Sequence, residues 1–230
     1  FMTNAMNMQN MSGGNNIKLA PSSYSDVGGP LAQIYTTKQH GGHNQNWTTI
    51  QSSDGLVYVG HTQGISQWDG EHWHNFVTPH STPVRSISQF KDDLYFGTTN
   101  DVFKLTINPA GELKATSLLD SLSDSGKPFG DIWSTASHAL GVIFVASEHT
   151  FFYDSKRLSR LDAAISSQHI IFNVNGTFYF KPKHLPHLYT LAITQSTGDI
   201  QGKLNKFPFE LPTKARVMEI LMGVNNHLTI

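Results

Sequence analysis

The amino-acid sequence repeats one pattern of short strands and turns, and this repetition limits the folds that the chain can adopt. The first copy, WTTIQSSDGLVYVGHTQGISQWDG, begins at Trp47, and a looser copy, VRSISQFKDDLYFGTTNDVFKL, begins at Val84. In the first copy, Asp54-Gly55 and Asp69-Gly70 are dipeptides typical of two-residue hairpin turns, and strand-like segments flank both. The first copy therefore predicts four short antiparallel strands in about thirty residues.

Four copies of the repeat share one position in their second strand. This position is occupied by Gly60, Gly97, Ala146 and Lys181. The copies lie 37, 49 and 35 residues apart, a spacing typical of β-propeller blades, although the strands of a β-sandwich recur at a similar density. The propeller is favoured because Trp47 and Trp133 each precede the shared position by thirteen residues, which a sandwich would not require.

We therefore predict an all-β fold, a β-propeller of four-stranded antiparallel blades with about four and a half blades present. The predicted blades are residues 44–76, 84–118, 131–161, 169–207 and, incomplete, 215–230. An incomplete blade would leave an open sheet edge, so we expect the N-terminal part of a longer propeller, or two open fans that pair edge to edge. Residues 1–28 are rich in Met, Asn and Gly and are predicted to be a flexible arm, in part vector-derived.

Composition excludes several classes of protein. The formal net charge of −1 and pI near 6.9 argue against nucleic-acid binding, which usually needs a basic surface. The absence of cysteine excludes disulfides, thiolate metal sites and cysteine nucleophiles. No apolar run is long enough to span a membrane, and residues 1–30 lack the apolar core of a signal peptide. Because a vector-derived start could have replaced a signal peptide, the second observation says little about compartment.

The repeat resembles that of a known family of sensor domains. Its pattern, D-G-hydrophobic-Y-V-G followed by G-I-x-x-W-D-G, resembles the two-component regulator propeller repeat. That family builds the sensor region of transmembrane histidine kinases and of receptors with diguanylate-cyclase (GGDEF) output domains. The similarity is good over residues 29–161 and fades over 169–230, where Lys181-Pro182 departs from the pattern, as Ala146 does in the third copy.

The resemblance implies a seven-bladed extracytoplasmic propeller in the periplasm, followed by a membrane helix and a cytoplasmic output domain. It also implies a homodimer, because two output domains usually must meet, and an unknown small-molecule ligand. The membrane would be reached only through C-terminal segments that this sequence does not contain.

Candidate ligand-binding residues lie at or beside the starts of the predicted inner strands, because recognition residues tend to lie on loops that a rigid scaffold carries. These residues are Asn46, Trp47, Arg85, Asp131, Trp133, His169 and Arg216. The arginines are suited to a carboxylate or phosphate, and the tryptophans to a sugar or other ring. The alternatives are core packing between blades for the tryptophans and solvated surface charges for the arginines.

Metal and catalytic chemistry have weak support in the sequence. His72 and His74 are weak metal candidates, because alternate strand residues share a face, but an exposed outer strand explains them better. The segment HGGH at His40 and His43 is interpreted as a turn. Trp68 is expected to fill the gap between neighbouring sheets. No nucleophile, P-loop or dinucleotide motif is present, so no catalytic residue and no cofactor are predicted.

Three functions remain open from the sequence. The first is a non-catalytic extracytoplasmic sensor domain of a transmembrane receptor, which rests on the family resemblance. The second is an extracytoplasmic propeller enzyme that acts on polysaccharide. The third is a scaffold that binds protein through a propeller face.

Overall fold

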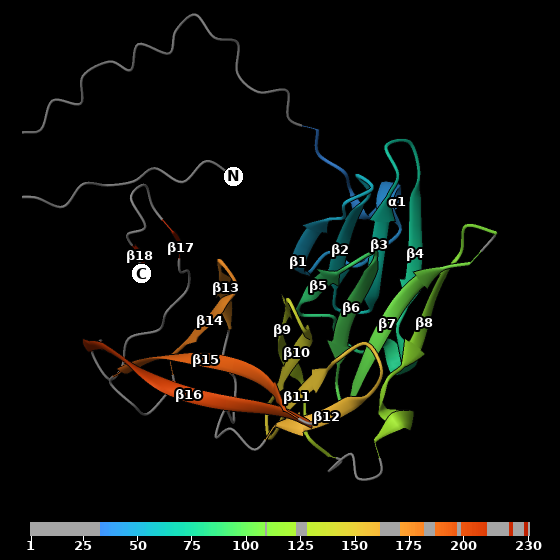
Figure 1. Cartoon of the computed structure of the whole chain (residues 1–230). Helices are drawn as coiled ribbons and strands as arrows, with labels where there is room; N and C mark the ends of the chain where they lie inside the picture. The colour runs from blue at the N-terminus through green and yellow to red at the C-terminus, as the bar shows by residue number, and fades with distance from the viewer. Residues whose placement is uncertain are drawn as a thin grey trace, which may run out of the picture. The chain divides into compact units, whose positions relative to one another are not determined.

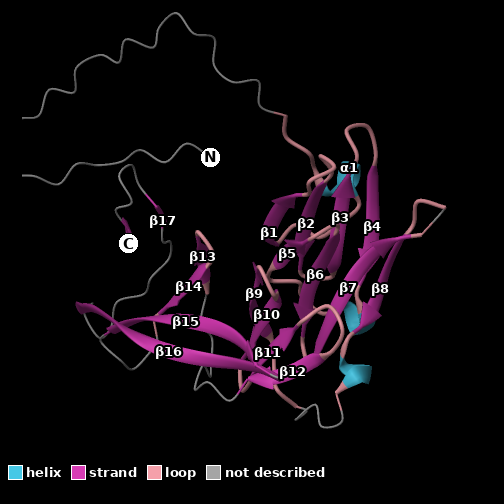
Figure 2. Ribbon diagram, in the orientation of Figure 1, coloured by secondary structure: helices cyan, strands magenta, loops and turns pink. Residues whose placement is uncertain are grey.

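The computed structural model describes residues 33–108, 110–122, 128–161, 171–181, 187–196, 199–210, 221–222 and 228–229. The regular structure in these ranges is almost entirely β-strand, in four four-stranded antiparallel sheets and one two-stranded sheet (Figure 1, Figure 2). Every helix and strand among the described residues lies within residues 35–230. No helix among the described residues is long and apolar enough to cross a membrane.

The strands follow one another in chain order within each sheet. The first sheet consists of β1 (Asn46–Gln51), β2 (Val57–His61), β3 (Gly64–Trp68) and β4 (Trp73–Val77). The second consists of β5 (Ile87–Phe90), β6 (Asp93–Thr98), β7 (Asp101–Ile107) and β8 (Leu113–Ser117). The third consists of β9 (Ile132–His138), β10 (Gly141–Ala146), β11 (Thr150–Tyr153) and β12 (Leu158–Leu161).

The fourth sheet has two short strands and two long ones. It consists of β13 (Phe172–Val174), β14 (Thr177–Phe180), β15 (His187–Ser196) and β16 (Asp199–Glu210). The remaining elements are β17 (Leu221–Met222), β18 (Leu228–Thr229), the one-turn helix α1 (Thr37–His40) and two 3₁₀ turns, Pro79–Ser81 and Leu119–Ser121.

This succession of four-stranded antiparallel meanders confirms the predicted fold class, a partial β-propeller. Each sheet is one blade, and the first inner strands of successive blades lie near one another. The predicted incomplete blade at 215–230 falls largely outside the described residues, apart from β17 and β18.

Successive sheets pack face to face through three hydrophobic cores. The core between the first and second sheets includes Tyr58, Ile65 and Phe96. The next core includes Tyr95 and Phe144, and the third joins the third and fourth sheets. Burying one such large apolar side chain contributes about 1.5–3 kcal/mol, so each inter-sheet core is a substantial source of stability.

In a blade that has a neighbouring blade on each side, the second strand is apolar at successive positions because both of its faces are buried. In β10, Val142 and Phe144 point into the core with the second sheet, whereas Ile143 and Val145 point into the core with the fourth. Alternate strand residues face opposite sides of a sheet, so a continuous apolar run fits a sheet covered on both faces.

The shared glycine position is where the next blade approaches most closely. A Cβ atom added at Gly97 would lie 2.3 Å from the Cβ of Ile132, at the start of β9, and one at Gly60 would lie 2.8 Å from the carbonyl oxygen of Val84. Both Ile132 and Val84 are fully buried. The glycines recur because a side chain there would push successive blades apart.

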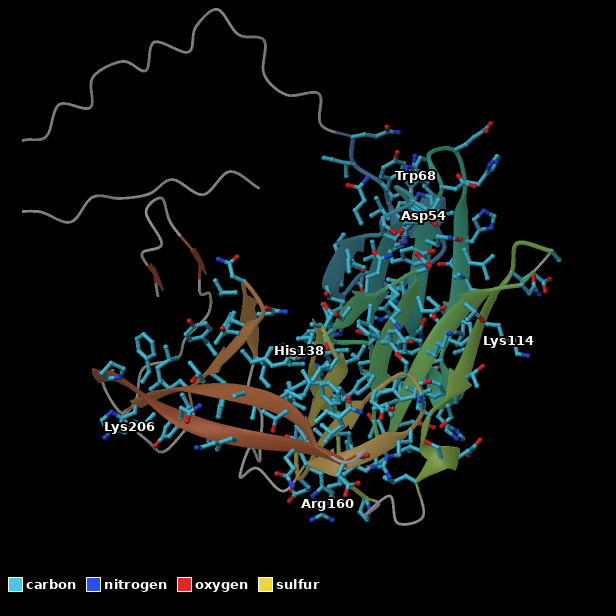
Figure 3. All side chains as sticks on the ribbon, viewed as in Figure 1. Asp54, Trp68, Lys114, His138, Arg160 and Lys206 are labelled. Carbon is cyan, nitrogen blue, oxygen red and sulfur yellow. The ribbon has the colours of Figure 1, made fainter. Side chains whose placement is uncertain are left out.

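Among the described sheets, Trp68 does not lie between two neighbours, which differs from the prediction for this residue. It stands three residues after Ile65 in β3 and points to the opposite face of the first sheet, where its ring centroid lies 5.0 Å from that of Tyr35 (Figure 3 labels Trp68). Trp73, opposite Trp68 in the β3–β4 ladder, lies on the same face. The segment before β1, and not a sheet, covers these rings.

Replacing Gly97 with alanine should destabilise the protein by about 1–3 kcal/mol, because the added methyl overlaps Ile132 and forces the second and third sheets apart. Urea unfolding measures the change in the free energy of unfolding. The matched reverse change is Ala146→Gly, which removes a methyl at the same repeat position. It should lower the free energy of unfolding by about 0.5–1 kcal/mol. An unchanged midpoint for Gly97→Ala would show that the blades do not need this close approach.

Candidate functional site

Four of the predicted ligand-binding residues meet in one cluster formed by three successive blades. Trp47 comes from β1 and Trp133 from β9, whereas Arg85 precedes β5 and Asp131 precedes β9. We call these four residues the tryptophan–arginine cluster.

The guanidinium of Arg85 lies over both tryptophan rings. Its central carbon is 4.5 Å from the centroid of the Trp47 ring and 4.5 Å from that of the Trp133 ring. Cation–π contacts of this kind contribute about 0.5–2 kcal/mol each, the larger values applying where the cation is removed from water. Arg85 therefore joins the first, second and third blades through one side chain.

Asp131 fixes the guanidinium in place. Arg85 donates hydrogen bonds from Nε (3.2 Å) and Nη2 (2.9 Å) to Oδ2 of Asp131, and the hydroxyl of Thr99 donates to Oδ1 at 2.5 Å. The side chains of Arg85 and Asp131 are only 17% and 26% exposed. The charge of Arg85 is thus already compensated, so the arginine is not a free clamp for an anionic ligand.

Bulges in the two inner strands direct the tryptophans toward Arg85. In β1, Asn46 pairs with His61 and Thr48 with Gly60, which leaves Trp47 as the extra residue. In β9, Ile132 pairs with Ala146 and Ser134 with Val145, which leaves Trp133 as the extra residue. β-Bulges commonly redirect a side chain, and here the same device appears in two blades.

The indole N–H groups of both tryptophans have hydrogen-bond partners. Trp47 Nε1 donates to the hydroxyl of Thr62 at 3.3 Å, and Trp133 Nε1 donates to the hydroxyl of Ser147 at 3.0 Å. Trp47 nevertheless remains 41% exposed, so part of its ring is open to solvent. The cluster thus offers an exposed aromatic surface beside a compensated ion pair, an arrangement able to bind a small molecule by stacking and hydrogen bonding.

The hydroxyl partners in the cluster were missed by the sequence analysis. Thr62 and Thr99 each follow the shared glycine position by two residues, and Ser147 follows it by one. A search for hydroxyl residues just after that position in each copy would have found them.

The other candidate residues lie apart from this cluster or outside the described residues. Asn46 is exposed at the start of β1, and His169 and Arg216 are not among the described residues. The ligand-binding role of all seven residues stays a prediction.

The weak metal candidates His72 and His74 do not form a pair on one strand. β4 begins at Trp73, so His72 lies in the preceding turn, where its backbone N–H donates to Asp69. His74 Nε2 lies 3.1 Å from Oδ2 of Asp69. Bonds from the backbone N–H groups of His72 and Glu71, and then from His74, hold the pKa of Asp69 far below its usual range. Among the described residues, no three His, Asp or Glu side chains are placed to hold a metal ion.

An acidic groove lies between the first and second sheets, near the turns that follow β1 and β5. It has a volume of about 350 Å³, and its lining includes Asp54 (labelled in Figure 3), Asp92 and Asp93. Asp93 forms a 2.5 Å ion pair with Lys104, and Asp54 accepts a hydrogen bond from Ser52 within its own turn. Asp54 and Asp93 thus each have a local partner, so neither carboxylate needs a ligand to explain its position.

Neither a family model nor a curated protein sequence matches this chain. Three solved structures from Bacteroides thetaiotaomicron share its fold. The extracellular domain of the hybrid two-component system BT3049 has a TM-score of 0.54 at 13% identity, covering 85% of this chain and 33% of that one. An auxiliary nutrient binding protein has a TM-score of 0.54 at 15% identity, covering 79% and 46%. The extracellular domain of the hybrid two-component system BT4673 has a TM-score of 0.50 at 16% identity, covering 77% and 23%.

These likenesses concern the fold, and this chain spans between 23% and 46% of the length of those three chains. Two of the three are extracellular domains of hybrid two-component systems. They agree with the resemblance of the repeat to the two-component regulator propeller family.

The ion pair of the cluster should show strong energetic coupling in a double-mutant cycle. Arg85→Met and Asp131→Asn should each lower the free energy of unfolding, and the double variant should lose less than the sum of the two. The coupling energy should be about 1–2 kcal/mol, because the charged hydrogen bonds are largely shielded from water. Urea unfolding of the four proteins measures it.

Arg157 and Asp199 provide the control pair. Nη2 of Arg157 lies 2.6 Å from Oδ1 of Asp199, between the third and fourth sheets, but the two side chains are 49% and 71% exposed. An exposed pair should couple by less than about 1 kcal/mol. Equal coupling energies for the two pairs would contradict a special role for the tryptophan–arginine cluster.

Proposed function

We propose that this chain is part of the non-catalytic, extracytoplasmic sensor domain of a transmembrane signalling receptor. The receptor would carry a histidine kinase or diguanylate cyclase as its output and would act as a homodimer, with the propeller in the periplasm. Support comes from the repeat motif and from the fold shared with extracellular domains of two-component systems. Fold likeness alone is an argument by analogy, so the site must supply the physical basis.

The observation that carries the proposal is the meeting of three blades at Arg85. Trp47, Arg85 and Trp133 belong to successive blades, and their contacts depend on how those blades are arranged. A ligand that stacks on the exposed part of Trp47, or bonds to the remaining N–H groups of Arg85, would favour one arrangement over another. Such differential binding is the physical requirement for passing a signal through a protein.

A thermal-shift screen tests for the ligand. The probes are amino acids, sugars, organic acids, nucleotides and divalent metals, each added to the folded protein. A ligand that binds only the native state stabilises it by about 2.7 kcal/mol at a hundredfold excess over the dissociation constant, which raises the melting temperature. We expect a hit whose shift is lost in Trp47→Ala and in Arg85→Ala.

Lys114→Ala is the control, because Lys114 is exposed on β8, the outer strand of the second blade (Figure 3). The ligand-induced shift is compared within each variant, so a lower starting stability does not affect the result. A hit that persists in both cluster variants would place the ligand elsewhere. A well-folded protein without any hit would favour a sensor driven by protein contacts or dimer arrangement, and turnover of a probe would contradict a non-catalytic role.

A further inference from the structure

The far face of the first sheet is covered by the segment before β1. We call residues 35–43 the strap. The ring of Tyr35 lies 5.0 Å from that of Trp68 and 5.4 Å from that of Trp73, and the His40 ring lies 5.7 Å from Trp73. The strap shields these aromatic side chains on the face of the sheet turned away from the second blade.

Local hydrogen bonds shape the strap before it meets the sheet. Thr36 and Gln39 form a reciprocal capping box around α1, and Gly41 ends the helix with φ of 68°, in the left-handed region. Asn75 on β4 then donates from Nδ2 to the carbonyl oxygen of His40 at 2.8 Å, and Ser66 on β3 donates to Oδ1 of Asn75 at 2.6 Å. The strap is therefore attached to the sheet by polar contacts as well as by stacked rings.

Gly42 lies directly against the sheet. A Cβ atom at this position would be 2.5 Å from the hydroxyl oxygen of Ser66 and 3.1 Å from Nε2 of His61. His61, at the end of β2, is only 3% exposed, and its Nε2 atom is buried without a hydrogen-bond partner. The closed strap thus seals an imidazole beneath its backbone.

The same backbone geometry favours one tautomer at three imidazoles of this contact. The backbone N–H groups of Gly42, Gln45 and Gln63 donate to the Nδ1 atoms of His40, His43 and His61, at 3.0, 3.0 and 3.2 Å. A backbone N–H can only donate, so each Nδ1 must carry a lone pair and no proton. At His61, a proton added to Nδ1 would break the Gln63 bond and place a charge beneath the closed strap.

We propose that the strap is an acid-sensitive cover, closed over the first sheet while His61 is neutral and released when His61 takes up a proton, because Gly42 of the closed strap lies directly over this buried imidazole. Release would expose Trp68, Trp73 and the neighbouring Val57 and Val59 on that face of the sheet. It would leave the apolar contacts between blades intact.

The surroundings of His61 favour this direction of response. Burial lowers the pKa of His61 below the ordinary value of 6.5, and the neighbouring His43 and His40 lower it further. From the strap, His61 is faced by those two histidines. β3 contributes Ser66, β4 contributes Asn75 and β1 contributes Asn46, none of which titrates.

The sign of the effect follows from this lowered pKa. Once the strap opens, His61 regains its ordinary value near 6.5, so the open form binds protons more readily than the closed one. Closure is therefore favoured above about pH 6.5 and is progressively lost as the pH falls below that value.

The same geometry argues against a metal at this cluster. Metal-binding imidazoles usually offer one nitrogen to the ion and donate a hydrogen bond from the other. Here each Nδ1 accepts a bond, which places the remaining proton on Nε2 and leaves neither nitrogen free for an ion.

Hydrogen exchange of the full chain at pH 7.5 and pH 5.5, corrected for the intrinsic pH dependence of exchange, tests the proposal by mass spectrometry. The opening equilibrium of the peptide covering residues 36–45 should rise by up to about tenfold, because His61 takes up a proton more readily in the open form. A third-blade peptide covering residues 141–153 should not change. Protection of the strap that does not depend on pH would overturn the proposal.

Variants then assign the response to the histidines. In His61→Asn, a side-chain oxygen can still accept the Gln63 N–H but cannot titrate, so the acid response should fall. The double variant His40→Asn/His43→Asn changes only half-buried strap residues and should also reduce the response, because these two histidines add to the lowering of the His61 pKa. It keeps the test valid if the buried variant folds poorly. His74→Asn, on exposed β4, should leave it unchanged. An acid response that persists when all three histidines are replaced would also overturn the proposal.

Discussion

Burial of both faces of each inner sheet is the constraint on which the rest of this structure depends. In β6, Phe96 packs toward the first sheet and Tyr95 toward the third, and β10 divides its apolar side chains in the same way. Such a sheet has no face suited to water, so each blade is stable only while a neighbour covers each side. The hydrogen bonds within a blade are local, but the free energy that maintains it comes from the blades beside it.

This stacking also positions the tryptophan–arginine cluster. The chain enters the second and third blades along the end of the second strand of the blade before. At the second blade, the Val84 N–H donates to the carbonyl oxygen of His61. At the third, Asp131 forms a β-bridge with Thr99. Arg85 and Asp131 are therefore brought near each other by the same entry path that packs Val84 and Ile132 against the shared glycine position. The cluster lies where blade packing is closest, so a change in packing would alter its contacts.

The repeat was readable from the sequence because its signals are local. Asn175-Gly176 forms the turn between β13 and β14 with positive φ at both residues, as that dipeptide predicts. The ion pair between Arg85 and Asp131 was not readable, because it joins residues 46 positions apart through the stacking of blades. The bulges at Trp47 and Trp133 shift the register by one residue, a change that hydrophobic alternation does not encode. The sequence placed both tryptophans at the inner strands, but their common contact with one arginine required the structure.

The first sheet differs from the others in the chemistry of its second face. Its contact with the second sheet is apolar, like the contacts between the later sheets, and contains no group that titrates near neutral pH among its buried residues. Its far face instead presents His61, Ser66 and Asn75 beside the two tryptophans, and meets the strap through stacked rings, the Asn75 bond to the carbonyl oxygen of His40 and the close approach of Gly42 to His61. Hydrophobic burial is largely indifferent to mild acid, whereas the buried His61 imidazole, whose Nε2 atom has no hydrogen-bond partner, accepts a proton more readily once the strap no longer covers it. The contacts between blades and the strap over His61 should therefore respond differently to pH, so under our proposal acid opens one face of the first sheet without separating the blades.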